Sequence, residues 1–366
     1  MESCILYQNA EKTVTLIDIP GSIELAQGNP VPKKLVSSQP RLQPYPSVEP
    51  RTAKARSNRS EISLKDLLLH KHLQLALDEI KASHQGSWCS PRVTNEQRDS
   101  KHVKKRRRPD VADVNCSTDT KPEEGKLYLE LGEAPFLSRN VESTPASAST
   151  GSDKTSVTLP PKSTILCGEV EATIELFEQS SSKFDLIVLD PPWPNRSARR
   201  KQSYDISYGP TEIRFLLSSL PIYDHLAEEA LVAVWVTNKS AFHEMLLEEG
   251  GLFQAWGIKW VEEWIWLKVT TTGEPICGID SAWRKPYEIL LIGRKTNEPV
   301  SDVTRKVVVG VPDLHSRKPN LKALCAESLP SQYEALEIFA RNLTSGWWSW
   351  GNEVLKFQTE EHWASP

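Results

Sequence analysis

Closely spaced cysteines are missing from this sequence. Its six cysteines are scattered over 366 residues, without a close pair or a Cys-His cluster. A disulfide framework and a zinc site both need such groups, so the spacing argues against both. No apolar run approaches the roughly 20 residues of a membrane-spanning helix. The first residues also lack the basic-then-apolar layout of a secretion signal, so we expect a soluble intracellular protein with no metal and no membrane partner.

Apolar side chains are scarce for a fully globular chain. They make up 39% of the sequence, which indicates that part of the chain is unfolded. A length of 366 residues favours two or three domains, one of which can be a disordered extension. The net charge of −4 hides local basic blocks, so the overall charge does not exclude a nucleic-acid partner.

Residues 1–156 are expected to form a partly disordered N-terminal extension. Alternating apolar and polar residues in 5–27, around Pro20-Gly21, predict a β-hairpin. Residues 28–59 carry Pro, Ser, Arg and Lys and are interpreted as a linker. Leucines at helical spacing predict a helix over 61–82 that packs on the rest of the protein, with a partner-binding helix as the alternative.

Two further segments of this region are interpreted as linkers. Residues 101–109 contain five successive cations, Lys104 to Arg108, which must be solvated. This block is typical of a nuclear-localisation address or of a phosphate-gripping arm, and a linker without a role is an equal alternative. Residues 140–156 are rich in Ser and Thr and predict a low-complexity linker. We place the domain boundary at its end, so that residues 157–366 form a second domain.

The second domain alternates strand and helix patterns. Short apolar runs predict strands, and the segments between them predict helices. This alternation implies an α/β fold with a doubly wound, Rossmann-like sheet that carries helices on both faces. Strands are expected at 164–167, 184–189, 230–236, 259–268, 288–293, 307–309 and 333–341, and helices at 171–179, 211–217, 240–249 and 318–329.

The strand over 184–189 ends at the tetrapeptide Asp190-Pro191-Pro192-Trp193. Proline cannot donate to a ladder, so the prolines end the sheet and hold an acid at the edge where α/β sheets bind ligands. An exocyclic amine on a nucleobase is a poor nucleophile, and an enzyme that alkylates it must accept both N–H hydrogens. Asp190 and the carbonyl of Pro191 supply two acceptors, and Trp193 offers a face for stacking. A capped strand end is the ordinary alternative for Asp-Pro-Pro alone.

This tetrapeptide resembles the catalytic motif of the MT-A70-like adenine N6-methyltransferases. The following residues, from Pro194 through the basic run to Tyr204, are most similar to the methyltransferase-like protein 4 branch. The resemblance covers roughly residues 157–357 and implies a class I methyltransferase sheet with S-adenosylmethionine as cofactor. It assigns catalysis to Asp190, Pro191, Pro192 and Trp193, and cofactor binding to Cys167, Gly168, Asp190, Lys318, Glu337, Arg341, Asn342, Asn352 and Glu353.

The order of the motifs agrees with that family, but two details depart from it. The methionine-binding strand of the family follows the catalytic tetrapeptide, which explains why no Gly-x-Gly loop precedes Asp190. The family segment Phe-Gly-Arg-Pro-His-Asn reads here Phe-Ala-Arg-Asn-Leu-Thr over 339–344. Asn342 is therefore our substitute for the ribose contact. Glu353 stands where another branch of the family has Gln.

The resemblance also implies a substrate. It points to RNA, with 2′-O-methyladenosine of a small nuclear RNA converted to N6,2′-O-dimethyladenosine, and hence to the nucleus. DNA adenine is the alternative, because the same amine chemistry applies. A non-catalytic nuclear RNA-binding partner is an alternative of another class, against which the intact tetrapeptide argues. Cations and aromatics suited to phosphates and bases predict the substrate-binding residues Asn195, Arg196, Arg199, Arg200, Lys201, Tyr204, Tyr208, Arg284 and Lys285.

Overall fold

The fold is known from a computed structural model. It describes residues 3–28, 33–46, 63–95, 128–150, 155–194, 209–281 and 284–364. Among the described helices, none has the length and apolar character needed to cross a membrane.

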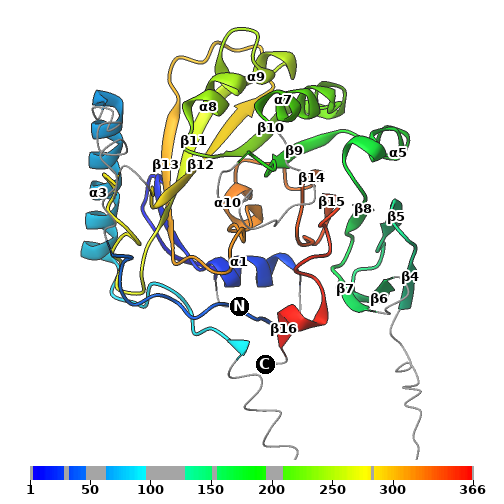
Figure 1. The fold of residues 1–366 in the computed structure, drawn as a ribbon, viewed down its shortest axis with the longest axis horizontal. Helices are drawn as coiled ribbons and strands as arrows, with labels where there is room; N and C mark the ends of the chain where they lie inside the picture. Colours follow the sequence, from blue (N-terminus) through cyan, green and yellow to red (C-terminus); the bar gives the residue numbers. More distant parts are fainter. Residues whose placement is uncertain are drawn as a thin grey trace, which may run out of the picture.

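One large sheet organises the described part of the chain (Figure 1). Most neighbouring strands are parallel, while β1, β12 and β5 run antiparallel to their neighbours. The mixed α/β sheet that the sequence predicted is thereby confirmed. From one edge to the other, its eleven strands are β1 (Ile5–Gln8), β2 (Val14–Ile17), β13 (Thr304–Gly310), β11 (Lys259–Lys268), β12 (Tyr287–Arg294), β10 (Leu226–Val236), β9 (Phe184–Leu189), β14 (Ala335–Ile338), β15 (Trp347–Gly351), β8 (Thr164–Cys167) and β5 (Phe136–Arg139).

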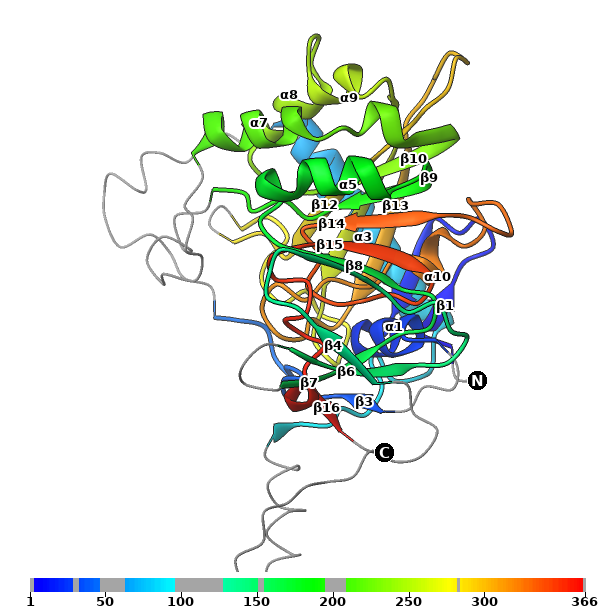
Figure 2. The same cartoon turned by 90° about the vertical axis from the view of Figure 1, so that its right-hand side faces the viewer.

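Helices cover both faces of this sheet (Figures 1 and 2). One face buries the larger apolar cluster under α3 (Leu64–Ser83), α5 (Ile174–Ser180), α7 (Pro210–Ser219), α8 (Ser240–Leu247) and α9 (Leu252–Ala255). The other face, which is concave in Figure 1, packs against α1 (Ile19–Ala26) and α10 (Lys322–Cys325). Smaller pairings join β3 (Lys34–Leu35) to β16 (Trp363–Ala364), and β6 (Ala146–Thr150) to β4 (Tyr128–Leu131) and β7 (Thr155–Leu159).

The predicted hairpin over 5–27 is only half right. Strands β1 and β2 pair antiparallel, but the turn between them is made by residues 9–13, where Asn9 Oδ1 accepts from the amides of Thr13 and Val14 at 2.9 and 3.0 Å. Residues 19–26 form helix α1. Pro20-Gly21 is therefore not a turn but the first turn of a helix, where proline needs no N–H.

The predicted linker over 140–156 is wrong in its central part. Strands β6 and β7 pair antiparallel there, so the boundary that we placed at 156 lies inside β7. Ala146 and Ala148 are buried, while Ser147 between them and Ser149 after them are half-buried. Burial that alternates from residue to residue is typical of a half-buried strand, but the side chains here are small and give little hydrophobic signal in the sequence.

The helix predicted over 61–82 is confirmed as α3, although residues 61–62 lie outside the described part. Ser63 caps it by accepting from the amide of Asp66 at 3.1 Å. Its buried face contains Leu69, Leu73 and Leu77 and belongs to the main core. The helix therefore packs on the sheet, beside β2 and β13, as predicted. The basic block 101–109 lies outside the described residues.

Most elements of the second half lie where the sequence placed them, but the helix predicted over 318–329 is wrong. Only Lys322–Cys325 is α-helical. Asn320 Oδ1 accepts from the amide of Lys322 at 2.9 Å and starts the helix late. The residues directly before Asn320, including Lys318, have no regular secondary structure.

Candidate active site

Asp190 lies at the carboxyl end of β9, between β10 and β14. Leu189 is paired with Val234 of β10 and with Ile338 of β14, both in parallel register. The carboxyl ends of three parallel strands therefore meet beside Asp190, at the edge where ligands of α/β sheets bind. Pro191 and Pro192 stop the ladder there, as the sequence predicted.

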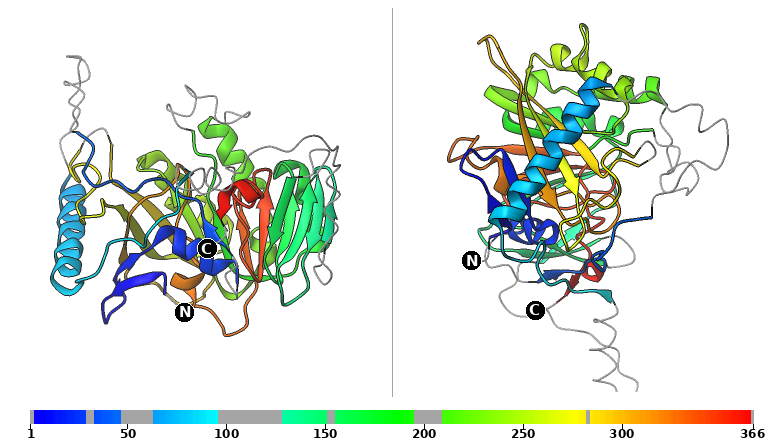
Figure 3. Two further views of the ribbon diagram at one scale, coloured as in Figure 1. Left: turned by 90° about the horizontal axis from the view of Figure 1, so that it is seen from below. Right: turned by 90° about the vertical axis from the view of Figure 1, so that its left-hand side faces the viewer.

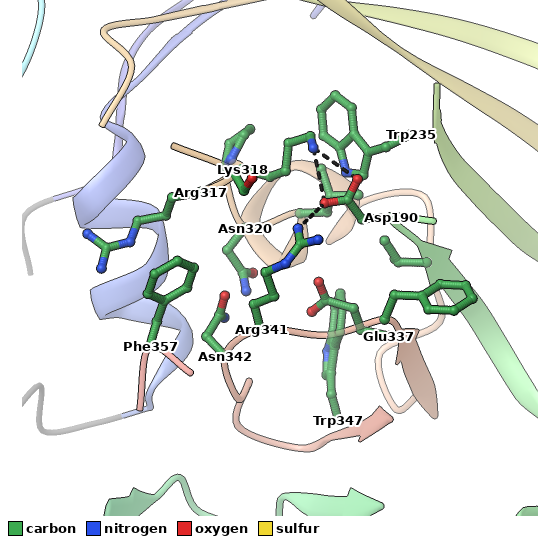
Figure 4. A pocket seen from close by; sticks show the side chains of 15 residues that line it. Asp190, Trp235, Arg317, Lys318, Asn320, Glu337, Arg341, Asn342, Trp347 and Phe357 are labelled. Atoms are coloured by element: carbon green, nitrogen blue, oxygen red, sulfur yellow. Dashed lines mark hydrogen bonds and ion pairs between the residues drawn. The ribbon is translucent and has the colours of Figure 1, made fainter. Parts of the chain in front are cut away.

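Two cations from distant parts of the chain hold the carboxylate of Asp190 (Figure 4). Lys318 Nζ lies 2.9 Å from Oδ1 and 3.0 Å from Oδ2. Arg341 Nη1 lies 2.8 Å from Oδ2. Asp190 is only 9% exposed, so these charge-assisted bonds offset the cost of burying its charge.

Each of these cations has a second carboxylate. Lys318 Nζ is 3.2 Å from an oxygen of Glu288, which also pairs with Lys268. Burial alone would raise the pKa of Glu288, but the ammonium groups of Lys318 and Lys268 outweigh it and lower that pKa to about 2. Arg341 Nε is 3.0 Å from Glu353. The site is thus a chain of alternating charges centred on Asp190.

The pKa values of Lys318 and Glu353 move in the directions that hold this chain charged. Burial opposes the charge of Lys318, but Asp190 and Glu288 outweigh it and raise its pKa above the usual 10.5. Burial likewise opposes the charge of Glu353, and its hydrogen bonds to Lys356 and Arg341 lower its pKa.

Glu337, on β14, differs from Glu288 and Glu353, because its pKa is raised and not lowered. Burial, together with the charge of Asp190, raises its pKa to about 7, although Arg341 and Lys318 act in the opposite direction. In Figure 4 its carboxyl group points toward the space below Arg341. A carboxyl group that titrates near neutral pH at a cavity wall can act as an acceptor or as a donor.

These groups surround one cavity on the concave side of the sheet. Its empty volume, counted with the solvent space at its open side, is about 480 Å³. Five residues predicted from the sequence line it: Asp190, Lys318, Glu337, Arg341 and Asn342.

In the rest of the tetrapeptide, Trp193 does not have the open ring face that the sequence predicted for stacking on a base. The carbonyl of Pro191 accepts from the amide of Trp193 at 2.8 Å. The indole of Trp193 is 9% exposed, packs on Phe242 with 4.6 Å between ring centroids, and donates to the carbonyl of Trp235 at 2.6 Å. The structure therefore places Trp193 as an anchor for the turn and not as an open stacking face.

The loop after β8 lies at the same edge of the sheet, with β14 and β15 between β8 and β9. Cys167 is buried and pairs with Gly351, while the amide of Gly168 donates to the carbonyl of Gly351 at 3.3 Å. Gly168 has a φ of +153°, and a Cβ there would lie 2.7 Å from Thr173, so the tight turn requires glycine. Asn352 donates to Glu169 at 2.6 Å. The predicted cofactor residues are thus brought to neighbouring strand ends.

The substrate-binding residues predicted between Asn195 and Tyr208 lie outside the described residues, so their role stays a prediction. Arg284 and Lys285 are described. Both precede β12, whose second residue is Glu288, and Arg284 is exposed while Lys285 is half-buried.

The sequence did not point to several residues of the site. Glu288 and Lys268 are predicted only as parts of strands, although a charged residue within an apolar run is a signal that could have been used. For the others, no local signal exists, because the fold alone brings them to the cavity: Trp235, Arg317, Asn320, Trp347 and Phe357.

The donors and acceptors around the cavity fit the cofactor that the sequence implied. S-adenosylmethionine carries a carboxylate, an ammonium group, a ribose diol and an adenine edge. Lys318 and Arg341 suit the carboxylate, Glu337 suits the diol, and amides such as Asn342 and Asn352 suit polar ring or ribose atoms. Among the described residues, no group of three or more His, Cys, Asp or Glu side chains could hold a metal ion.

Comparisons with known proteins agree with this geometry. The family model of MT-A70 matches residues 184–353, which contain β9, Asp190, Lys318 and Arg341. The chain is 40% identical over 372 residues to the N6-methyladenosine RNA methyltransferase MTA1 of Cryphonectria parasitica, covering 98% of this chain and 94% of that protein.

Two further relatives match a little over half of this chain. The N(6)-adenine-specific methyltransferase METTL4 of Homo sapiens is 41% identical over 213 residues, covering 55% of this chain and 43% of that protein. A DNA N6-methyl methyltransferase of Caenorhabditis elegans is 34% identical over 218 residues, covering 57% of this chain and 56% of that protein. With the tetrapeptide, the sheet and the near full-length match in agreement, this chain belongs to the MT-A70 family of N6-adenine methyltransferases.

Proposed function

We propose that this protein transfers a methyl group from S-adenosylmethionine to N6 of an adenine in RNA. The observation that carries the proposal is Asp190, held at the end of β9 by Lys318 and Arg341 at the wall of the cavity. S-adenosylmethionine would supply the electrophilic methyl group at this site. The remaining requirement, which is to hold the amine, falls to the residues of the chain.

Within the described part of the chain, the contacts of Asp190 and Pro191 leave two acceptor positions open. A carboxylate has about four lone-pair positions, and three of those of Asp190 are used by Lys318 and Arg341. One position on Oδ1 remains. The carbonyl of Pro191 has two lone pairs and uses one for the amide of Trp193. The two N–H groups of an adenine amine can thus be accepted by two neighbouring oxygens, which leaves the nitrogen lone pair free to be aimed at the methyl group.

The cations and Glu337 would hold the cofactor. Lys318 or Arg341 would bind its carboxylate, and Glu337 would accept from its ribose hydroxyls. Asn342, Asn352 and Glu353 are the further candidates for polar contacts along the ends of β14 and β15. Since Lys318 and Arg341 also hold Asp190, cofactor binding and the orientation of the catalytic acid depend on the same two side chains.

RNA is the favoured substrate because the relative that matches nearly the whole chain is named as an RNA methyltransferase. Within RNA, we propose 2′-O-methyladenosine of a small nuclear RNA, with N6,2′-O-dimethyladenosine as product and the nucleus as the location; the support is the similarity to the methyltransferase-like protein 4 branch and the basic block at 101–109. DNA adenine is the second candidate, favoured by the name of the Caenorhabditis relative.

The test is a transfer assay with matched oligonucleotides. RNA containing adenosine, RNA containing 2′-O-methyladenosine and DNA of the same sequence are incubated with the protein and cofactor, and the products are read by nucleoside mass spectrometry. We expect the highest rate on the 2′-O-methylated RNA, and a rate at least about 100-fold lower with Asp190→Asn. Equal rates with Asp190→Asn would reject catalysis at this site and would favour the non-catalytic RNA-binding partner.

A further inference from the structure

An N-terminal segment is bonded to the loop that follows β11 and to Asp313. We call residues 38–46 the strap. Its start is fixed by Asp313 Oδ1, which accepts from the amide of Ser38 at 2.7 Å. Further along, the carbonyl of Arg41 accepts from the amide of Thr271 at 2.9 Å, and the amide of Tyr45 donates to the carbonyl of Ile276 at 2.7 Å. In Figure 3 this blue segment runs beside the yellow loop that follows β11.

The strap ends in a stack of two guanidinium groups on one aromatic ring. The Cζ of Arg41 lies 3.8 Å from the ring centroid of Tyr45, and the Cζ of Arg284 lies 4.1 Å from the same centroid. Two groups so close to one centroid must lie on opposite faces, because on one face they would overlap. The ring of Tyr45 therefore lies between Arg41 of the strap and Arg284, which the sequence predicted to bind the substrate.

The two guanidinium groups of this stack carry like charges close together. At most about 8 Å separates the two guanidinium carbons, where like charges repel by roughly 0.5–2 kcal/mol. No carboxylate of the described residues forms an ion pair with either guanidinium, and toward these residues Arg41 donates through Nε, to the carbonyl of Gln43 at 3.3 Å. A guanidinium stacked on a ring keeps its N–H groups in its own plane, free to form a two-pronged contact with a phosphate.

The stack is connected to the active site through short paths. Ile276, which binds Tyr45, donates its amide to the carbonyl of Lys268 at 3.0 Å, and Lys268 pairs with Glu288. Arg284 and Glu288 are four positions apart in the sequence, so their Cα atoms lie within roughly 14 Å of each other even for an extended chain. A polynucleotide whose adenine enters the cavity would pass this surface.

We propose that Arg41, Tyr45, Arg284 and Lys285 form a clamp for the phosphates of the polynucleotide that carries the target adenine. The strap is then part of the substrate-binding surface. The inference rests on the proposed function, and it adds Arg41 and Tyr45 to residues that the sequence had singled out. Phosphate contacts position a strand but do not read its bases, so the clamp acts alike on RNA and DNA.

The test measures binding alone, without methyl transfer. The affinity of the full chain for a labelled single-stranded RNA and a DNA of the same sequence is measured over a range of salt concentrations. Variants are Arg41→Ala, Tyr45→Ala and Arg284→Ala. The control is Arg139→Ala, which removes a guanidinium stacked on Trp348 at 4.6 Å, on the edge strand β5.

We expect each arginine substitution in the clamp to weaken binding of both strands about tenfold or more at low salt. The slope of log affinity against log salt should decrease by about 0.7 for each phosphate that is no longer bound, with no decrease for Arg139→Ala. An unchanged slope together with a lower melting temperature would show that the stack only fastens the strap, and would overturn the clamp. A protein that binds as expected but methylates nothing would reject the proposed function and leave the clamp supported.

Discussion

The single negative charge of Asp190 is bound by two positive charges, those of Lys318 and Arg341. Removing its charge has two consequences, because the amine loses its acceptor and the cations lose their common partner. We expect Asp190→Asn to reduce the rate of methyl transfer by at least about 100-fold, the usual cost of removing one preorganised polar group that acts in a transition state. Initial rates at saturating cofactor measure this.

The matched control for that variant is Asp302→Asn, which changes an exposed carboxylate away from the cavity. Its rate should equal that of the unchanged protein. A rate for Asp190→Asn within a few-fold of the control would show that the amine is held elsewhere.

Glu337 makes cofactor binding depend on pH. Its raised pKa of about 7 means that the folded protein holds it protonated below that value and ionised above it. If the carboxylate accepts from the ribose hydroxyls, the Kd for S-adenosylmethionine should fall about tenfold between pH 6 and pH 8. Calorimetric titration across this range, with Glu337→Gln as comparison, measures it. The glutamine variant should show a flat profile, and a slope that survives in it would assign the titration to another group.

The same shift affects stability with the opposite sign. The unfolded chain ionises Glu337 near its ordinary pKa of 4.5, while the folded chain resists ionisation up to about 7. This group therefore lowers the stability of the protein without ligand as the pH rises from about 4.5 to 7, and adds no further change above that.

The residues of the site could be predicted from sequence only where a motif carried them. Asp190, Lys318 and Arg341 stand in short patterns with a fixed order along the chain, and the structure brings all three together. Glu288 and Lys268 come from strands whose neighbours are apolar, and nothing in the local pattern states which way a strand side chain points until the register is known. The stacking role predicted for Trp193 is wrong because a motif states that an aromatic is present, not whether it is covered.

At the scale of elements, a buried ion cluster ties three segments together. The carboxylate of Asp313 forms ion pairs with Arg317, at 2.5 Å from Nη1 to Oδ2, and with Arg92, at 3.7 Å from Nη1 to Oδ1. It also accepts a hydrogen bond from the amide of Ser38. All three charged side chains are at most 2% exposed. The cluster joins the strap, the segment after α3 and the residue next to Lys318.

Removing the one acid of this cluster should be costly. We expect Asp313→Asn to lower the free energy of unfolding by about 3–5 kcal/mol, because two buried guanidinium groups lose their carboxylate. Denaturant unfolding measures this. The control Glu327→Gln removes the exposed pair with Lys12 and should cost at most about 1 kcal/mol. A loss for Asp313→Asn as small as the control would mean that water already reaches the cluster.

Helices and strands could be predicted from the sequence where large apolar side chains mark their buried positions. β9, β11 and the central part of β10 are apolar runs bounded by clear breaks, and the structure confirms them. β6 and β7 alternate alanine, valine and hydroxyl residues, a pattern that composition alone identifies as low complexity. The short α10 was overextended because Lys318-Pro319 satisfies the rule for a helix start, whereas the contact of Lys318 with Asp190 holds these residues in another path.

For the whole molecule, the N-terminal region completes the sheet. β2 pairs with β13 in parallel, and α3 covers both strands. We expect a fragment of residues 157–366 to be insoluble or to lack a cooperative thermal transition, since it exposes an apolar edge strand and the surface under α3. Solubility and differential scanning calorimetry measure this, and co-expression of residues 1–156 should restore both. A fragment of residues 157–366 that melts cooperatively without residues 1–156 would show that it folds independently, as a domain boundary at residue 156 implies.

The position of β14 and β15 has a consequence for biosynthesis. These strands lie between β9 and β8 in the sheet, yet they come near the end of the chain. From Leu189 to Gly351 the ribosome must add 162 residues (351 − 189), which takes roughly 8–32 s at 5–20 residues per second. During that interval β8 and β9 have no strand to join them, and Asp190 is already made while Lys318 and Arg341 are not. A message truncated before the codon for Ala335 would therefore yield a chain whose large sheet is in two unconnected parts, with β8 and β5 separated from β9 and the strands beyond it.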